Sequence, residues 1–381
     1  MRKKMKTKGV ATSGRALGIA LAFFFLVSGL NAQQVIENSD KPLSKNAGRV
    51  LALQPVFRIT DQSGDFFFKG IWLLKVASNG EIYIFDYDQL LRFASDGKFI
   101  KNLLKKGQGP GEVTKAGYPY DARFIATRNA LYIYDFNARK VIHAKPDGDY
   151  IDEFKIKSGY PSGIWGQIED CLIFTEEEAI PIGATKTAGL RDLEVAILFM
   201  INDGSSSKKF LSFPRQVYLG PGFAMDWAPF DVAVAEDGTR LYVSHTCEYK
   251  IVQVDLKAGK IIRSFRRKYP HVDYVVKAWE KDFIKRHNVN PKKYENDVLG
   301  IFVNKGKIWI RTYTKDDKKG YLIDIFDQEG KYIDNFYVSI PGAIVAVQDD
   351  CIYSTEQDKD GNMQVVKYEI AKNERKRDLS A

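Results

Sequence analysis

Few residues of this chain have types and spacing that could do chemistry. The four histidines are His143, His245, His271 and His287, and none of them forms a pair at the spacing of zinc ligands. No serine or cysteine stands in a motif typical of an activated nucleophile. The run Glu176-Glu177-Glu178 offers carboxylate oxygens that suit Ca²⁺, although acidic runs are usually solvated loops. We expect no resident cofactor and no catalytic residue, with Ca²⁺ or another divalent cation as the alternative.

A glycine-rich segment from Lys106 to Glu112 (KGQGPGE) resembles a phosphate-binding loop in composition. Such a loop needs a helix N-terminus after it and a terminal Lys-Ser or Lys-Thr pair, and this segment has neither. Its glycines are better explained by a tight crossover between two structural units. We therefore expect a structural role for this segment and for Gly220-Pro221-Gly222, which has a similar composition.

The elements around these residues are short strands joined by tight turns. Residues 80–112, together with the apolar strand over residues 66–76 that enters them, form a four-stranded unit, and the turns Asn79-Gly80 and Asp96-Gly97 are strong hairpin signals because such turns need positive φ. Similar units begin near residues 121, 163, 230, 298 and 344. The sixth unit lacks its fourth strand. Residues 50–59, an apolar strand interrupted by Pro55, can supply that strand at an outer edge.

We therefore predict an all-β fold, a six-bladed β-propeller whose last blade is closed by an N-terminal strand. Two stacked β-sandwiches are the alternative, but they would not require tight turns at two fixed points of every unit. The predicted limits are a flexible lead-in over residues 33–49, the propeller over residues 50–371 and a charged tail over residues 372–381.

Residues 1–32 have the pattern of a secretory signal peptide. Six basic residues precede an apolar run from Ala16 to Leu30, and Asn31-Ala32-Gln33 follows it. An uncleaved membrane anchor is the alternative, but the run is short for the ~20 residues of a spanning helix. No cysteine lies near the cleavage point for lipid attachment. We expect an exported protein, periplasmic or extracellular, with no membrane anchor after cleavage.

Removal of the six basic residues in this peptide lowers the formal net charge from +9 to +3. The charge of the full chain would otherwise suggest nucleic-acid binding, which the nearly balanced mature chain does not support.

Cys171 and Cys351 fall in the third and sixth units, on opposite sides of the predicted ring, whereas a disulfide needs Cα atoms within about 7 Å. Cys247 lies toward the other end of its strand. All three cysteines are expected to remain thiols.

The first two predicted blades resemble a known group of proteins. The loop Lys106 to Glu112, the strand Ile82-Tyr83-Ile84-Phe85-Asp86 and the turn Asp96-Gly97-Lys98 are similar to those of bacterial exported six-bladed β-propellers related to NHL-repeat propellers. The resemblance implies the propeller fold over essentially the whole mature chain, and it implies no settled activity. In later blades Thr175, His245 or Thr312 replaces the Asp after strand two, so no repeated site is expected there.

Loop lengths indicate which face of the propeller binds a ligand. Connections after strands one and three of each unit are short, whereas the long ones follow strand two or join units. Long loops on a rigid scaffold usually carry function. The long connections cover residues 105–120, 175–193, 214–229 and 269–297. We place binding on this loop-rich face, around the mouth of the central channel. The candidate ligand contacts are Gln108, Glu112, Glu176, Glu177, Asp226, Trp227 and His245.

The connection over residues 269–297 is expected to contain a helix. Its apolar residues recur three or four positions apart, as on one face of a helix: Val275, Val276, Trp279, Phe283 and Ile284. Asn288 and Pro291 would end this helix. It could form a lid over the channel or pack against the rim.

These features favour an exported, non-catalytic propeller that recognises a protein, peptide or glycan on its loop-rich face. The alternative is a metal-dependent hydrolase or lyase of the propeller lactonase kind, with its site at the channel mouth. A carboxylate or Asn recurring on the inner strands would favour that enzyme. No such recurring position is evident in the inner strands Phe230–Val234, Val298–Val303 and Ile344–Val347.

Overall fold

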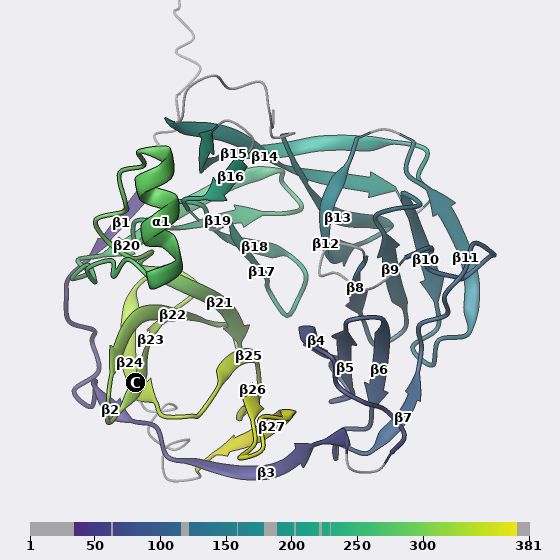
Figure 1. Ribbon diagram of the computed structural model, residues 1–381, viewed down its shortest axis with the longest axis horizontal. Helices are drawn as coiled ribbons and strands as arrows, with labels where there is room; N and C mark the ends of the chain where they lie inside the picture. The colour runs from purple at the N-terminus through teal and green to yellow at the C-terminus, as the bar shows by residue number, and fades with distance from the viewer. Residues whose placement is uncertain are drawn as a thin grey trace, which may run out of the picture. The chain divides into compact units, whose positions relative to one another are not determined.

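The computed structural model describes residues 34–61, 64–115, 122–157, 159–178, 189–201, 203–220, 223–228 and 230–371. The predicted signal peptide and charged tail lie outside these ranges. Within them, six antiparallel sheets are arranged radially around a common axis (Figure 1), which confirms the predicted six-bladed β-propeller. We number the sheets as blades 1 to 6 in chain order, with the first strand of each blade innermost.

The first two blades each have four strands. Blade 1 consists of β4 (Ile71–Val76), β5 (Ile82–Asp86), β6 (Gln89–Phe93) and β7 (Phe99–Asn102). Blade 2 consists of β8 (Ala122–Ala126), β9 (Leu131–Asp135), β10 (Lys140–Ala144) and β11 (Tyr150–Lys155). Every residue of β5 and β9 is buried, because both faces of a blade pack against neighbouring blades.

Blade 3 has five strands and is the most elongated. It consists of β12 (Pro161–Ile168), β13 (Cys171–Glu177), β14 (Gly189–Ile201), β15 (Ser207–Gly220) and β16 (Phe223–Asp226). Much of the predicted loops over residues 175–193 and 214–229 is therefore strand. β14 and β15 remain hydrogen-bonded beyond the body of the blade, from Met200 paired with Ser207 to Gly189 paired with Leu219. The two strands therefore form a long hairpin where the sequence predicted loops.

The last three blades follow the same pattern. Blade 4 contains β17 (Asp231–Val234), β18 (Arg240–Ser244), β19 (Ile251–Asp255) and β20 (Lys260–Arg267). Blade 5 contains β21 (Val298–Asn304), β22 (Lys307–Asp316), β23 (Gly320–Phe326) and β24 (Tyr332–Val338). Blade 6 contains β25 (Ala343–Gln348), β26 (Cys351–Gln357) and β27 (Met363–Ile370) from its own repeat.

The N-terminal segment over residues 34–59, here termed the belt, runs along the outer edges of blades 4, 5 and 6 (Figure 1). β1 (Gln34–Asn38) pairs in parallel with β20, and β2 (Arg49–Val50) pairs in parallel with β24. β3 (Leu53–Ile59) pairs antiparallel with β27 and completes blade 6, as predicted. The prediction of a flexible lead-in was wrong for β1 and β2, because their backbones form hydrogen bonds with the outer strands of blades 4 and 5, β20 and β24.

The apolar core is divided among the spaces between blades. Six clusters of buried side chains each join two neighbouring blades. Leu91 of blade 1 and Val365 of blade 6 share one such cluster, so the two ends of the repeat pack directly together. Gly97 contacts this region in a conformation that suits glycine, with φ of 84°, and a Cβ there would lie 2.7 Å from the ring of Phe57.

The Asp that follows strand two in blades 1 and 2 has a structural role. Asp86 is fully buried and accepts hydrogen bonds from the backbone N–H groups of Lys69, at 3.0 Å, and Gly70, at 2.6 Å. Asp135 is also fully buried and accepts one from Thr114 N–H at 2.7 Å. Each carboxylate thus fixes the segment of chain that enters its blade from the preceding blade. The Asp that follows strand two therefore stabilises the fold in blades 1 and 2.

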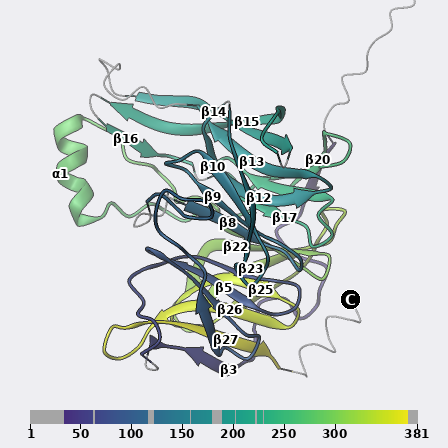
Figure 2. The same cartoon turned by 90° about the vertical axis from the view of Figure 1, so that its right-hand side faces the viewer.

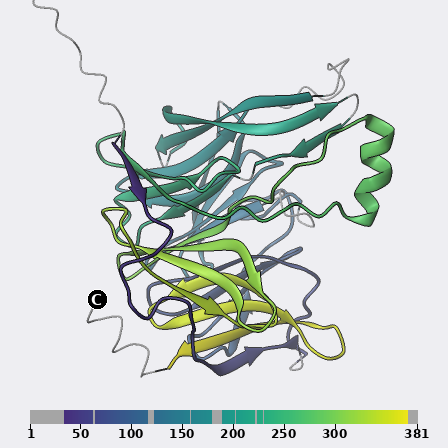
Figure 3. The same ribbon diagram turned by 90° about the vertical axis from the view of Figure 1, so that its left-hand side faces the viewer.

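The connection over residues 269–297 forms a stalk with a helix at its tip. α1 (Ala278–His287) ends at Asn288, whose φ of 49° and ψ of 46° form a left-handed cap, as the sequence indicated. The two arms of the stalk pair through Tyr274 N–H and Lys293 O at 3.0 Å and through Glu295 N–H and Val272 O at 2.8 Å. Figures 2 and 3 show α1 standing away from the sheets, and Figure 2 shows it on the same side as β16.

A buried polar network joins blades 4 and 5. Arg267 Nε donates to Asp324 Oδ2 at 2.7 Å, and the two side chains are 4 % and 0 % exposed. Asp324 also accepts hydrogen bonds from the hydroxyls of Tyr249, at 2.8 Å, and Tyr332, at 2.7 Å. The guanidinium lies 4.8 Å from the ring centroid of Tyr269. Each charge of this buried pair therefore has a partner of opposite charge, and removal of either residue should strongly lower the free energy of unfolding.

We predict that Asp324→Ala lowers the free energy of unfolding by about 3–5 kcal/mol, because it leaves the Arg267 charge and two tyrosine hydroxyls buried without their acceptor. Urea unfolding followed by tryptophan fluorescence measures this change. Asp317→Ala, at an exposed position in the β22–β23 turn, is the matched control and should change stability by less than about 0.5 kcal/mol. Equal midpoints for the two variants would contradict the prediction.

Candidate functional site

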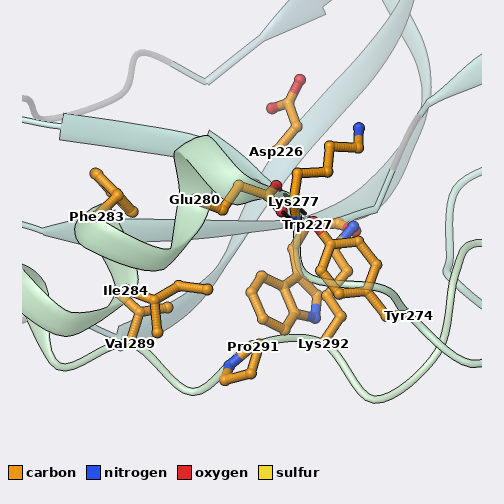
Figure 4. Close-up of a pocket in the computed structure, with 10 residues that line it drawn as sticks. All are labelled: Asp226, Trp227, Tyr274, Lys277, Glu280, Phe283, Ile284, Val289, Pro291 and Lys292. Atoms are coloured by element: carbon orange, nitrogen blue, oxygen red, sulfur yellow. Dashed lines mark hydrogen bonds between the residues drawn. The ribbon is translucent and has the colours of Figure 1, made fainter.

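A concave site lies between α1 and the end of β16, on the loop-rich face. This helix pocket has a volume of about 250 Å³. The side chains that line it come from the turn after β16, from both arms of the stalk and from α1 (Figure 4): Asp226, Trp227, Tyr274, Lys277, Glu280, Phe283, Ile284, Val289, Pro291 and Lys292. In Figure 1, α1 lies over the outer strands of blade 4 rather than over the ring axis.

The apolar part of the helix pocket follows from the helix periodicity. Phe283 and Ile284 lie on the side of α1 that faces the stalk, where Val289 is 4 % exposed and Pro291 continues the wall. The helix, which lies off the ring axis, therefore does not cover the channel as a lid, and its apolar side borders a cavity instead of a packed rim.

Hydrogen bonds fix the charged residues at the base of α1. Glu280 accepts a hydrogen bond from the Tyr274 hydroxyl at 2.5 Å and another from Lys277 N–H at 2.8 Å, which caps the start of the helix. Burial alone would raise the pKa of Glu280, but these hydrogen bonds outweigh it and the pKa is lowered. Glu280 is therefore a buried anion that orients Tyr274 toward the pocket.

Lys292 and Trp227 form the opposite wall. The Lys292 ammonium donates to Trp227 O and lies 5.3 Å from the centroid of the indole ring. Trp227 also contacts Tyr218, with ring centroids 5.8 Å apart. Burial lowers the pKa of Lys292, although the thiol of Cys247 and nearby carboxylates oppose this effect.

Arg215 connects two of the predicted site residues. Its guanidinium pairs with Glu177 at the end of β13 and with Asp226 at the end of β16, while the Arg215 side chain itself is only 12 % exposed. Asp226 and Glu177 therefore lie close together, as the sequence suggested. Because Arg215 pairs with both carboxylates, the three side chains brace the long hairpin of blade 3 and hold Asp226 at the pocket rim.

The other predicted site residues do not line the helix pocket. Gln108 is exposed in the crossover between blades 1 and 2. Glu112 turns back into the same crossover and accepts Gly109 N–H at 2.8 Å, so this glycine-rich segment has the expected structural geometry. Glu176 accepts Tyr160 N–H at 2.7 Å.

His245 is a core residue rather than a surface ligand contact. It is 8 % exposed, its Nδ1 lies 3.1 Å from Pro214 O, and burial lowers its pKa. Of the seven predicted contacts, Asp226 and Trp227 line the pocket. Sequence reasoning missed Tyr274, Lys277 and Lys292, although all three lie within the 269–297 insertion that it singled out.

A second polar arrangement supports the stalk. His271 Nδ1 lies 2.9 Å from Asp297 Oδ1, and the buried Asp297 carboxylate also accepts Tyr249 N–H at 2.8 Å. Burial raises the pKa of Asp297, and His271 opposes that shift. A His–carboxylate pair can activate a nucleophile, but the nearby Cys247 thiol donates to Trp227 O at 3.4 Å and burial raises its pKa. We therefore assign the His271–Asp297 pair a structural role in the stalk.

Donor sets for a metal ion are also absent from the part of the chain that the structure describes. No group of three or more His, Cys, Asp or Glu side chains is placed there to hold an ion. None of the three cysteines, all of which lie within the described ranges, forms a disulfide, as the ring geometry predicted.

Charged residues on the innermost strands of three blades interact electrostatically. Lys75 is on β4 of blade 1, Arg123 on β8 of blade 2 and Asp231 on β17 of blade 4, and these are innermost strands. Asp231 Oδ2 accepts Ile301 N–H at 2.8 Å. Burial raises the pKa of Asp231 to about 6, although backbone N–H groups and the charges of Lys75 and Arg311 oppose this shift. Sequence reasoning saw no recurring carboxylate on inner strands, and Asp231 is indeed a single one.

The radial sheets, together with the stalk and the long blade 3 hairpin on one face, define a six-bladed β-propeller with a pocket on its loop-rich face. Residues 61–174 match the model of a family described as a 6-bladed beta-propeller. This match confirms the predicted resemblance to six-bladed propellers, and it covers the two blades in which the motifs were recognised.

Solved structures give the same class of fold. The chain is similar to an exported-protein candidate from Bacteroides fragilis, with a TM-score of 0.54 at 15 % identity over 89 % of this chain and 100 % of that one. It is also similar to a member of the DUF4221 family from Bacteroides vulgatus, with a TM-score of 0.55 at 11 % identity over 85 % of this chain and 99 % of that one. At these identities the likeness extends to the fold alone.

No curated protein matches the chain. A search of the described residues for a helix long and apolar enough to span a membrane finds none.

The raised pKa of Asp231 predicts a pH dependence of stability. Between about pH 4 and pH 6 the folded protein holds the Asp231 proton while the unfolded chain releases it, so wild-type stability falls as pH rises through this window. Asp231→Asn cannot titrate. The stability of the wild type relative to this variant should therefore decrease by on the order of 1–3 kcal/mol from pH 4 to pH 7.

Urea unfolding at four pH values measures this difference. The exposed Asp317→Asn variant corrects for general effects of pH and of replacing an aspartate. A constant difference between the wild type and Asp231→Asn across the range would show that burial does not raise the pKa of Asp231.

Proposed function

We propose that this protein is an exported, non-catalytic binding propeller that recognises a peptide segment of a protein partner in the helix pocket. Export is supported by the signal-peptide pattern of residues 1–32 and by the likeness in fold to an exported-protein candidate. Export would place the protein in the periplasm or outside the cell. The propeller supplies a rigid scaffold, and the stalk and blade 3 hairpin supply the recognition surface.

The observation that carries this proposal is the apolar wall of the pocket next to a charged rim. Phe283, Ile284, Val289 and Pro291 form a surface that can receive one apolar side chain. Binding energy at protein interfaces is concentrated in such anchors, which fill a pocket and exclude water. A volume of about 250 Å³ accommodates a single large side chain of a peptide.

The rim favours a peptide over a glycan. Acidic Asp226 and basic Lys277 stand at the rim around the apolar wall, so charges of both signs lie next to the pocket, within reach of peptide side chains and backbone groups. Sugar recognition would instead be favoured by an aromatic ring free to stack on a sugar face. Trp227 already contacts Tyr218 and the Lys292 ammonium.

The hydrolase or lyase considered from the sequence receives no support from a specific observation. Asp231 is a single carboxylate on an innermost strand, the cations Lys75 and Arg311 act on it, and Arg123 acts on Lys75. Such surroundings favour an anion over a metal ion. We therefore do not propose a second function.

Selection of a displayed random-peptide library on the purified protein tests the proposal. Peptides enriched on the wild type should carry a large apolar residue, and Ile284→Gln should raise their Kd at least tenfold, or about 1.4 kcal/mol. Fluorescence anisotropy with labelled synthetic peptides measures the Kd.

Lys285→Gln is the matched control, since it introduces the same side chain at the next, exposed position of α1, which does not line the pocket. It should leave the Kd within twofold of the wild type. Equal loss of binding in both variants, or enriched peptides insensitive to Ile284→Gln, would overturn the proposed site. Binding to arrayed glycans that depends on Ile284 would replace peptide recognition by glycan recognition.

A further inference from the structure

The innermost strands form a closed ring around the axis of the propeller. Neighbouring inner strands contact each other in the order β4, β8, β12, β17, β21, β25 and back to β4. In a ring of six, blade 1 stands opposite blade 4 and blade 2 stands opposite blade 5. Side chains from opposite blades can interact only if both extend toward the axis.

Lys75 and Asp231 come from opposite blades and nevertheless act on each other electrostatically. Because the two strands stand across the ring from each other, this interaction crosses the axis. Lys75 is partly buried, yet its ammonium makes no hydrogen bond or ion pair with any residue in the described part of the chain. Three N–H groups of a cation are thus left without a protein acceptor near the centre of the ring.

Arg311 reaches the same region from blade 5. Its Nη1 donates to Ile344 O of the inner strand of blade 6 at 3.4 Å, a long contact. Its Nε is buried and has no hydrogen-bond partner. The charge of Arg311 acts on Asp231, which places the guanidinium near the same carboxylate as Lys75. A buried guanidinium N–H without an acceptor is costly unless a ligand supplies one.

Arg123 strengthens the positive field from blade 2. Its charge acts on Lys75 and, together with burial, lowers the pKa of the ammonium, while Asp231 opposes this shift. Like charges in a partly dehydrated site repel one another unless an anion joins them. The only carboxylate among these four residues, Asp231, is already hydrogen-bonded to Ile301 N–H and Val232 N–H.

We propose that the centre of the ring is an anion-binding site, in which Lys75, Arg311 and Arg123 bind a small oxyanion, a carboxylate or a phosphate, and Asp231 limits its affinity. Carboxylate and phosphate oxygens are strong acceptors for ammonium and guanidinium donors. The site is separate from the helix pocket, which lies over the outer strands of blade 4, and it does not depend on peptide binding.

Isothermal titration calorimetry on protein purified after expression of the full chain tests the proposal. The probes are sodium phosphate and sodium succinate, each compared with sodium chloride at equal ionic strength. We expect saturable, one-site binding of at least one probe. Preference for phosphate would assign the site to phosphate groups, and preference for succinate would assign it to carboxylates. Absence of saturable binding by either probe up to 10 mM, a limit of about 3 kcal/mol of affinity, would overturn the proposal.

Three variants separate binding from a structural role. Lys75→Met and Arg311→Gln should each raise the Kd of the bound probe at least tenfold, because each removes a donor. Asp231→Asn should lower the Kd, since it removes the competing negative charge while its side-chain oxygen can still accept Ile301 N–H. Lys285→Gln, on exposed α1, and Ile284→Gln, in the helix pocket, should leave the Kd unchanged.

A purely structural cluster would give a different pattern. The three central variants would then change the melting temperature and leave the Kd of the probe unaltered, and this outcome would overturn the proposal. If Arg311→Gln fails to fold, Lys75→Met and Asp231→Asn still decide the matter by their opposite signs. Loss of probe binding in Ile284→Gln would place the anion in the helix pocket instead of the ring.

Discussion

Pairing between the belt and blade 6 is the interaction on which the rest of this propeller depends. β3 supplies the fourth strand of a sheet whose other strands come from the far end of the repeat, from Ile59 paired with Val365 to Leu53 paired with Ile370. Without it, Leu91 and Val365 would lose the cluster that joins the first and last blades. Each inner strand keeps its distance from the axis only while the ring is closed. The polar groups near the axis therefore depend on hydrogen bonds made at the outer edge.

Burial of polar groups follows two different patterns in this ring. Between blades 4 and 5, Arg267 and Asp324 satisfy each other with the help of tyrosine hydroxyls, and this network binds two sheets together. Near the axis, Lys75 and Arg311 retain donors without protein acceptors. Structural networks in proteins are normally complete, whereas incomplete ones occur where a ligand or water completes them. The contrast separates a structural role for Arg267 from a binding role for Lys75.

The two faces of the propeller differ for a geometric reason. Connections between hairpin partners on one face are constrained to tight turns, as Gly80 and Gly97 with φ of 84° illustrate. The other face also carries the crossovers between blades, which can lengthen without disturbing any strand pairing. The stalk with α1 and the extended hairpin of blade 3 both grow there, and Arg215 holds the hairpin through Glu177 and Asp226. A recognition surface arises from their proximity, as in Figure 4.

The sequence alone determined the number of blades, the closing strand and the helix in the insertion, and it named Asp226 and Trp227, which the structure places in the lining of the helix pocket. These features depend on local properties, namely apolar alternation, turn residues with positive φ and a helix-ending Asn288. Only the tertiary structure decided that β1 and β2 complete outer edges, that His245 is buried, and that the charges of Lys75 and Asp231 act on each other across the ring. Such contacts join residues far apart in the chain, and they depend on ring closure and blade orientation, which no local propensity encodes.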